Sequence, residues 1–476
     1  MRLNSSATIV LTALLSCEPQ AFAAGTRQPN FIVIYADDLR ADGLSGLGGP
    51  APTPNLDRLL ARSMRFPHAM VVSPLCTPSR AQLLTGRYSS QNGVAELPPE
   101  KPGDTAPRRT RFNAGEPLLP ELLRAGGYIT GVVGKWHIDN APETCGFDFV
   151  RTVYGNGDYY DQSYTDEDGR RHPTTGHVED ANAAFGSEFL AHAHAAKKPF
   201  FLFYNTRAPH MDSRYSWPSE AATRARLSDE RFHLPETLDG SLEGKPSYLE
   251  AGRNRTQAMR YGYEDPARVR QHQQEYYATI VELDAKIQRL LDAIEREDLA
   301  DSTYIVFMGD NGWFLGEHLF TSKVLAYEAS VRVPLFISGP GIGPGSSVEL
   351  ATNLDIAPTL LDWAGVAVPD KVYGRSLRSA VSSGGGALRN AVLYEMAPAP
   401  DTARNPFIQA LRTDTMKLIR TYRTGSETDV EFVELYDLAR DPQERHNLAD
   451  YPEFAARLKE INERMDQEIE AVARGR

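Results

Sequence analysis

Short, almost wholly apolar runs that alternate with helical patterns constrain the fold of this chain more than any other feature. The clearest runs are residues 31–35, 129–133, 200–204 and 304–308. Strands that are apolar on both faces are typical of parallel sheets with helices on either side. Residues 274–297 carry apolar side chains at helical spacing and are expected to form one such helix. The pattern predicts an α/β fold with a large, mostly parallel central sheet.

A second, smaller unit is expected at the C-terminal end, because 476 residues are too many for one ordinary core. Residues 382–386 are rich in Ser and Gly and mark the boundary. The tail beyond them has turn-rich links between short strand candidates, followed by a helical stretch from Pro452. We therefore predict a large domain over residues 25–385 and a subdomain over 386–476, an antiparallel sheet with a packed helix. The strand candidates are residues 391–395, 408–412, 417–422 and 431–436.

Residues 1–24 are typical of a secretory signal peptide. Arg2 precedes the apolar run 7–15, and small residues at Ala21 and Ala23 fit a cleavage site. The run is too short to span a membrane stably. A second interpretation is a lipoprotein signal, in which Cys17 is acylated and anchors the chain. Either interpretation predicts an exported protein, periplasmic or secreted.

Net charge and cysteine content restrict the partners and the disulfide bonds expected of this chain. The formal net charge of -12 argues against nucleic acid as a partner. Cleavage after Ala23 would leave only Cys76 and Cys145, and a disulfide between them is the simplest expectation for an exported chain. Against it, Cys76 directly precedes an apparent helix start, where Thr77 can cap. A helix N-terminus there would suit a bound anion.

Polar side chains follow each of the four predicted strands at its C-terminal end. In open α/β sheets, ligands bind outside the carboxyl ends of the strands, so these side chains should converge on one site. The side chains among them that offer only oxygen donors favour Ca²⁺ over Zn²⁺ as a bound ion. In strand order the residues are Asp37 and Asp38, Lys135 and His137, His210, and Asp310 and Asn311.

Four motifs identify a family that the chain resembles. Residues 76–80 read Cys-Thr-Pro-Ser-Arg and match the pattern Cys-x-Pro-x-Arg. Residues 127–137, Asp310-Asn311-Gly312 and the tail segments 434–438, 441–442 and 447–448 also match. With these motifs the chain resembles type I sulfatases of the alkaline phosphatase superfamily over nearly all of its mature length. In that family the motif cysteine is oxidised to formylglycine by a separate maturation enzyme.

The resemblance implies an alkaline phosphatase-like fold, sulfate ester hydrolysis and a role for each matching residue. Sulfate would pass to the formylglycine hydrate, the alcohol would leave, and elimination would free sulfate. The implied calcium ligands are Asp37, Asp38, modified Cys76, Asp310 and Asn311. Arg80 would hold the hydrate, and Lys135, His210 and Lys323 would bind sulfate. His210 would also protonate the leaving group, and His137 would take a proton from the hydrate.

The substrate is expected to be a sulfated carbohydrate, a glycosaminoglycan or algal polysaccharide fragment. Aromatic, Arg and His side chains adjacent to the catalytic positions suit a sugar ring with acidic groups, although aromatic residues near strand ends often serve packing alone. Two alternatives stay open: a phosphonate or phosphate diesterase of the same superfamily, and a non-catalytic glycan-binding protein if Cys76 is never oxidised. The sugar, the sulfate position and exo or endo action are not defined. The candidate substrate-binding residues are Trp136, Asn205, Arg207, Trp313 and His318.

Overall fold

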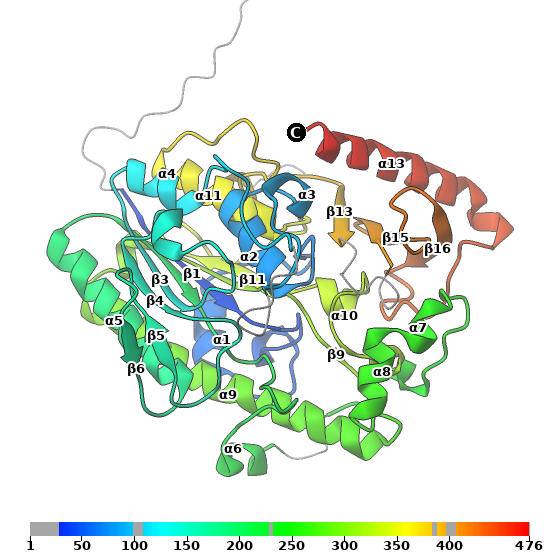
Figure 1. Ribbon diagram of the computed structural model, residues 1–476, viewed down its shortest axis with the longest axis horizontal. Coiled ribbons are helices and arrows are strands. Elements are labelled where there is room, and N and C mark those ends of the chain that lie inside the picture. The colour runs from blue at the N-terminus through cyan, green and yellow to red at the C-terminus, as the bar shows by residue number, and fades with distance from the viewer. Residues whose placement is uncertain (1–27, 99–107, 228–231, 383–387, 397–405, 476) are drawn as a thin grey trace, which may run out of the picture.

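A computed structural model describes residues 28–98, 108–227, 232–382, 388–396 and 406–475. A ten-stranded sheet forms its centre, in the order β12-β2-β11-β8-β1-β7-β3-β4-β5-β6 (Figure 1). The five inner strands run parallel, and antiparallel pairs join the outer strands to them on both sides. The inner strands are β8 (Thr303–Gly309), β1 (Asn30–Ala36), β7 (Phe200–Asn205), β3 (Ile129–Lys135) and β4 (Phe149–Val153). The outer strands are β11 (Leu335–Ser338), β2 (Met64–Arg65), β12 (Gly345–Ser346), β5 (Ser163–Thr165) and β6 (Arg171–Pro173).

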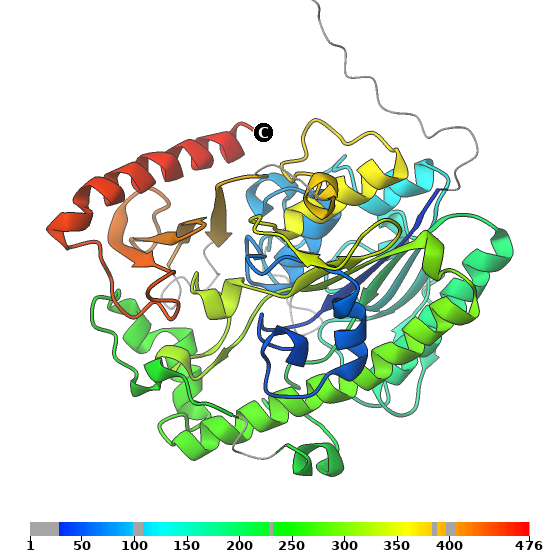
Figure 2. The same cartoon turned by 180° about the vertical axis from the view of Figure 1, so that it is seen from behind.

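Helices cover both faces of this sheet, as the doubly apolar strands predicted. Along β1, Ile32 and Ile34 belong to one core cluster, and Phe31, Val33 and Tyr35 belong to another. The first cluster lies under α1 (Pro54–Ala61), α5 (Val178–Ala196) and α9 (Pro266–Arg296), and Figure 2 shows α9 crossing that face. The second lies under α2 (Cys76–Thr85), α4 (Leu119–Ala125) and α11 (Ile356–Ala364). The α/β prediction and all four predicted strands are confirmed.

Helix α9 confirms the predicted amphipathic helix but begins two turns earlier. Asp265 caps it by accepting a hydrogen bond from the Ala267 amide, and Pro266 occupies the first helical position. The first two turns are mainly polar, so hydrophobic spacing gave no sign of them. The Asp-Pro pair was the available start signal.

The C-terminal sheet is antiparallel, as predicted, and its strands follow chain order. Its strands are β13 (Ala391–Met396), β14 (Ile408–Thr413), β15 (Met416–Tyr422) and β16 (Val430–Asp437), with α13 (Ala455–Ala473) packed on them (Figure 1). Its core cluster also contains Met70, Phe314 and Phe320 from the larger part of the chain. The two parts are therefore joined through a common apolar core. The boundary predicted at 382–386 falls largely outside the described residues.

Short elements complete the fold. The remaining helices are α3 (Ser89–Asn92), α6 (Ala221–Ala225), α7 (Tyr248–Ala251), α8 (Arg253–Arg260), α10 (Glu328–Val331) and α12 (Arg378–Val381). Strands β9 (Phe314–Leu315) and β10 (Thr321–Ser322) form a small hairpin. The 3₁₀ turns are Ser45–Leu47, Pro142–Cys145, Glu236–Asp239, Ala300–Ser302, Glu317–Leu319, Asn353–Asp355 and Pro452–Phe454.

The predicted signal segment 1–24, with Cys17, lies outside the described residues, so export and lipid anchoring remain predictions. Among the helices that the structure does describe, none is long and apolar enough to cross a bilayer.

A buried lysine joins the C-terminal sheet to the rest of the molecule. Lys417 on β15 is 1% exposed, and its Nζ lies 2.7 Å from Glu444 Oε1 and 2.8 Å from Glu328 Oε1. Removing one partner of a buried ion pair leaves uncompensated charge. We expect Lys417→Met to lower the free energy of unfolding by about 3 kcal/mol, measured by urea denaturation. Lys459→Met, which breaks an exposed pair with Glu463, is the control and should stay within about 0.5 kcal/mol of the parent. Equal losses in the two variants would contradict this.

Candidate active site

The predicted site residues lie together at the carboxyl ends of the inner strands. Asp37 and Asp38 follow β1, and Asp310 and Asn311 follow the adjacent β8. The Asp38 amide donates to Asp310 Oδ1 at 2.9 Å, and Asn311 Nδ2 donates to Asp38 Oδ1 at 2.7 Å. All four residues are fully buried. Parallel pairing of β1 and β8 therefore brings distant parts of the chain into one polar cluster.

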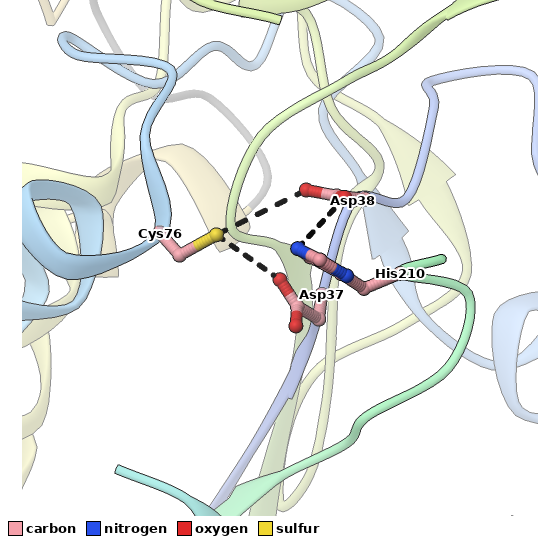
Figure 3. Close-up of side chains that lie close together, drawn as sticks. All are labelled: Asp37, Asp38, Cys76 and His210. Atoms are coloured by element: carbon pink, nitrogen blue, oxygen red, sulfur yellow. Dashed lines mark hydrogen bonds and ion pairs between the residues drawn. The ribbon is translucent and has the colours of Figure 1, made fainter. Parts of the chain in front are cut away.

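Cys76 opens α2 and points its sulfur at the carboxylates after β1. Sγ lies 3.3 Å from Asp37 Oδ1 and 4.0 Å from Asp38 Oδ1 (Figure 3). The cap expected from Thr77 was wrong, and the disulfide alternative is excluded. Leu75, with no side-chain cap, precedes the helix, while the Thr77 hydroxyl donates to the His137 carbonyl at 2.7 Å. Cys76 and Cys145 are both free and buried, so they form no disulfide.

The Cys76 thiol is held in its protonated form. Burial, reinforced by the negative charge of Asp37, raises its pKa to about 12. Reactive cysteines need a lowered pKa, because the thiolate is the nucleophile. An unmodified Cys76 is therefore poorly suited to nucleophilic attack.

Arg80 lies one turn along α2 and ties three strand ends together. Its guanidinium is fully buried, with Nη2 2.8 Å from Asp310 Oδ2. Nη1 donates to Asn205 Oδ1 at 2.5 Å and to the Lys135 carbonyl at 3.0 Å. Asn205, predicted to bind substrate, is 0% exposed and holds Arg80 in this position.

Lys135 ends β3 with its ammonium inside the cluster. Nζ lies 2.6 Å from Asp37 Oδ2 and donates to Asn156 Oδ1 at 2.8 Å. The preceding Gly134 has φ +92, and a Cβ there would lie 1.9 Å from the Asn205 carbonyl oxygen, so only glycine allows this approach. Asn156 was not predicted. It follows β4, so the strand-end rule would have indicated it had β4 been recognised.

Lys323, on the loop after β10, contacts the centre of the cluster. Its Nζ forms an ion pair with Asp38, lies 2.6 Å from Cys76 Sγ and 3.3 Å from Asn311 Oδ1. Both neighbours, Ser322 and Val324, have positive φ (73° and 89°). Such a φ is rare for a β-branched residue such as Val324.

Two groups hold this strained loop in place. Asn254 Nδ2 donates to the Lys323 carbonyl at 2.8 Å. From the C-terminal sheet, the Tyr394 hydroxyl donates to the Val324 carbonyl at 2.5 Å. The surrounding structure therefore imposes the position of Lys323, which supports a functional role for it.

Two histidines face the cluster. His210 Nδ1 pairs with the Met211 carbonyl at 2.7 Å, which directs Nε2 toward Asp38 Oδ2 at 3.6 Å (Figure 3). His137 has positive φ, and its Nδ1 is buried without a hydrogen-bond partner. Burial lowers the pKa of both rings well below the usual value. Neutral His137 can accept a proton, and a nearby anion would favour the protonated form of His210.

The donor set fits a hard divalent cation. Burial and repulsion from Asp37 raise the pKa of Asp310 to about 7, and a cation between the carboxylates would relieve that repulsion. Asp38 Oδ2 is buried without a hydrogen bond. Ligand atoms of Asp37, Asp38, Cys76 and His210 lie within 4.8 Å of one another, so they could surround one ion. Carboxylate and amide oxygens still predominate, which favours Ca²⁺.

A cavity of about 420 Å³ opens onto Cys76, His137, His210 and Lys323. Of the five candidate substrate-binding residues, Arg207 and Trp313 line it, although Arg207 is 2% exposed and donates to the Met211 carbonyl. Trp136 instead packs edge-on against Phe147. His318 lines a separate cavity of about 680 Å³ that contains none of the predicted catalytic residues. The cavity near Cys76 is therefore the one relevant to catalysis, although its volume is smaller than that of the cavity lined by His318.

Comparisons with known proteins show the family of the chain. The family model described as Sulfatase matches residues 29–366, and the one described as N-sulphoglucosamine sulphohydrolase, C-terminal, matches residues 316–471. An N-acetylglucosamine-6-O-sulfatase from Bacteroides thetaiotaomicron is 30% identical, over 98% of this chain and 91% of its own. Human arylsulfatase A is also 30% identical, over 90% of this chain and 85% of its own. A solved structure in complex with its substrate D-glucosamine-2-N,6-O-disulfate superposes with a TM-score of 0.83 at 27% identity, covering 94% of this chain and 98% of that one.

Proposed function

The chain belongs to the sulfatase family and is a sulfuric ester hydrolase, and from this premise we propose that it removes sulfate from sulfated carbohydrates. The nucleophile is a formylglycine made from Cys76, beside one calcium ion. The observation that carries the proposal is the position of Cys76 Sγ, 3.3 Å from Asp37 and 2.6 Å from Lys323, at the floor of an open cavity. Similarity to two proteins whose names or complexes refer to sulfated glucosamine supports this sugar as the first to test.

The charges of the site suit a sulfate ester. Three carboxylates, Asp37, Asp38 and Asp310, are matched by three cations, Arg80, Lys135 and Lys323. Calcium, held by Asp37, Asp38, Asp310 and Asn311, would supply the positive charge that binds and polarises an entering sulfate. Lys135, Lys323 and His210 would then contact its oxygens and stabilise charge as it shifts toward the leaving group.

Addition of water to a formylglycine aldehyde at residue 76 would give a hydrate with two hydroxyls, one that attacks sulfur and one whose deprotonation expels sulfate and regenerates the aldehyde. The chain's own groups provide the proton transfers. His210 Nε2 faces the cluster and, when protonated, can donate to the leaving alkoxide. Neutral His137, with an unpaired Nδ1, can accept the second proton. Through its ion pair with Asp310, Arg80 holds the start of α2 next to that carboxylate.

The proposal extends to maturation and location. A formylglycine-generating enzyme must act on Cys76 before the fold closes, because the mature side chain is 1% exposed. Export to the periplasm or outside the cell, through residues 1–24, fits a polysaccharide substrate too large to enter the cell. Acylation at Cys17 is the alternative route to the same location.

One assay tests the function. The purified protein, with the mass of its residue-76 peptide measured first, is incubated with sulfated mono- and oligosaccharides, an aryl sulfate, and phosphate and phosphonate diesters. We expect free sulfate from at least one carbohydrate, with kcat/KM well above that for the phosphorus esters. Faster cleavage of a phosphonate or phosphate diester would favour the diesterase alternative. Glycan binding without turnover, together with a thiol at residue 76, would favour a non-catalytic glycan-binding protein.

A further inference from the structure

Two exposed tyrosines border the cavity that leads to Cys76. Tyr154 and Tyr215 both line it, yet their side chains are 66% and 57% exposed. They come from different loops, one after β4 and one after β7. Ligand-binding cavities are commonly lined by aromatic side chains. None of the mechanism above uses them.

The loop that carries Tyr215 is built to present it. Asp212 Oδ1 accepts hydrogen bonds from the Arg214 amide at 2.9 Å and the Ser216 amide at 3.0 Å, which close the turn around Tyr215. Tyr215 itself has φ +63, a left-handed conformation that costs free energy for a bulky residue. The backbone of Tyr215 is therefore strained, and its ring remains exposed to solvent.

A second ring supports Tyr215 from behind. Tyr261 lies against it, with ring centroids 5.7 Å apart and a 43° angle between the ring planes. Gln257, on α8, fixes Tyr261 by donating to its hydroxyl at 2.6 Å. Gln257 also lines the cavity. Tyr215 is thus contacted by one ring, while 57% of its side chain remains exposed.

Tyr154 is tied to the catalytic cluster through its own loop. Two residues on, Asn156 accepts the hydrogen bond from Lys135 Nζ at 2.8 Å. The Gly157 carbonyl accepts a further bond from Arg207 Nε at 3.3 Å. The loop that carries this exposed ring is therefore anchored by the residues that surround the reaction centre.

Charge at the entrance favours no particular sign. Arg253 and Asp158 are both exposed and line the cavity, and Asp212 lines it as well. The entrance of the cavity offers instead the aromatic surface of Tyr154 and Tyr215. Sugar rings present a flat face of C–H groups, which packs well against such rings while their hydroxyls stay hydrated.

We propose that Tyr154 and Tyr215 form a second sugar subsite at the cavity entrance. It binds the ring linked to the sulfated sugar whose sulfate group reaches Cys76. The inference rests on the proposed function, because it assumes a carbohydrate in the inner cavity. It makes this protein an enzyme for oligosaccharides, with a preference over monosaccharides of the same sulfated sugar.

The test compares one sulfated sugar in two sizes. Glucosamine 6-sulfate and a tetrasaccharide with that sugar at its non-reducing end are assayed with the parent and with Tyr154→Ala/Tyr215→Ala. We expect the double variant to lose on the order of 10- to 100-fold in kcat/KM for the tetrasaccharide, mainly through KM. The loss on the monosaccharide should be at least tenfold smaller. Tyr154→Phe/Tyr215→Phe, which keeps both rings, should restore the tetrasaccharide rate.

The controls separate the subsite from the function. Tyr451→Ala removes a tyrosine that is 51% exposed but outside the cavity lining, and it should match the parent on both sugars. Equal losses on the two sugars, or no loss, would overturn the subsite alone. If the parent hydrolyses neither sugar, the proposed function fails for this substrate. Calorimetric binding of the tetrasaccharide to the Cys76→Ala protein, with and without the two tyrosines, then decides the subsite, and equal affinities would overturn it.

Discussion

Cys76→Ser is expected to accept one sulfate group and then stop. A serine hydroxyl at the start of α2 can attack sulfur, since the site around residue 76 is unchanged. The resulting sulfate ester has no second hydroxyl on the same carbon, so no elimination can release the sulfate. Steady-state kcat should fall by roughly a thousandfold or more, a loss typical of removing a catalytic nucleophile. The variant should gain the mass of one sulfate group on the peptide that contains residue 76.

Cys145→Ser is the matched control. Cys145 is buried in the 3₁₀ turn Pro142–Cys145 and belongs to the core cluster beneath α4, away from the carboxylate cluster. Its variant should turn over near the parent rate after correction for folded protein. Repeated turnover by Cys76→Ser at a near-normal rate would rule out the formylglycine mechanism, as would a parent protein that is fully active with a thiol at residue 76.

Calcium removal should produce the second large effect. We expect dialysis against a chelator to lower kcat/KM by at least about a hundredfold, because the positive charge that binds and polarises the sulfate would be lost. Added Ca²⁺ should restore the rate, and Zn²⁺ should not, given a donor set dominated by oxygen. Calcium should also raise the free energy of unfolding, by about 2.7 kcal/mol at a hundredfold excess over Kd, and the unfolding temperature should rise with it.

Asp38→Asn tests whether this one residue is a calcium ligand. The amide keeps the size of the side chain and removes the charge that faces Cys76 and Lys323. Its calcium response, followed by thermal unfolding, should be much weaker than in the parent. Asp370→Asn, on the exposed surface, should respond like the parent. An unchanged calcium response in Asp38→Asn would exclude Asp38 as a ligand.

Four of the five inner strands and the polar side chains that follow them could be predicted from the sequence, because continuous apolar runs and the residues after them need only local pattern. The prediction failed at β4. Arg151 interrupts that run, but its guanidinium lies 4.4 Å above the Phe149 ring and pairs with Glu167 and Glu188, so the charge remains outside the sheet. Missing β4 also meant missing Asn156, the partner of Lys135.

The predicted substrate contacts show a second limit. Neighbouring residues on an extended segment point to opposite sides. Lys135 enters the site, and Trp136 therefore packs away from it, against Phe147. Nearness along the chain to a catalytic residue is consequently weak support for a role in binding. The tyrosines at the cavity entrance lie on connecting loops, whose paths depend on contacts such as those of Asp212 and carry no periodic signal.

The hydrogen bond from Tyr394 to the Val324 carbonyl limits how this protein can diversify. It places a residue of the C-terminal sheet next to Lys323, so the tail is a structural part of the reaction centre and cannot be exchanged as an independent module. A chimera that took its last strands from a distant relative would inherit a working site only if the donor strand supplied a hydroxyl at the same register. Recombination at this junction is therefore expected to be rare, and the two parts of the chain should change together over evolution.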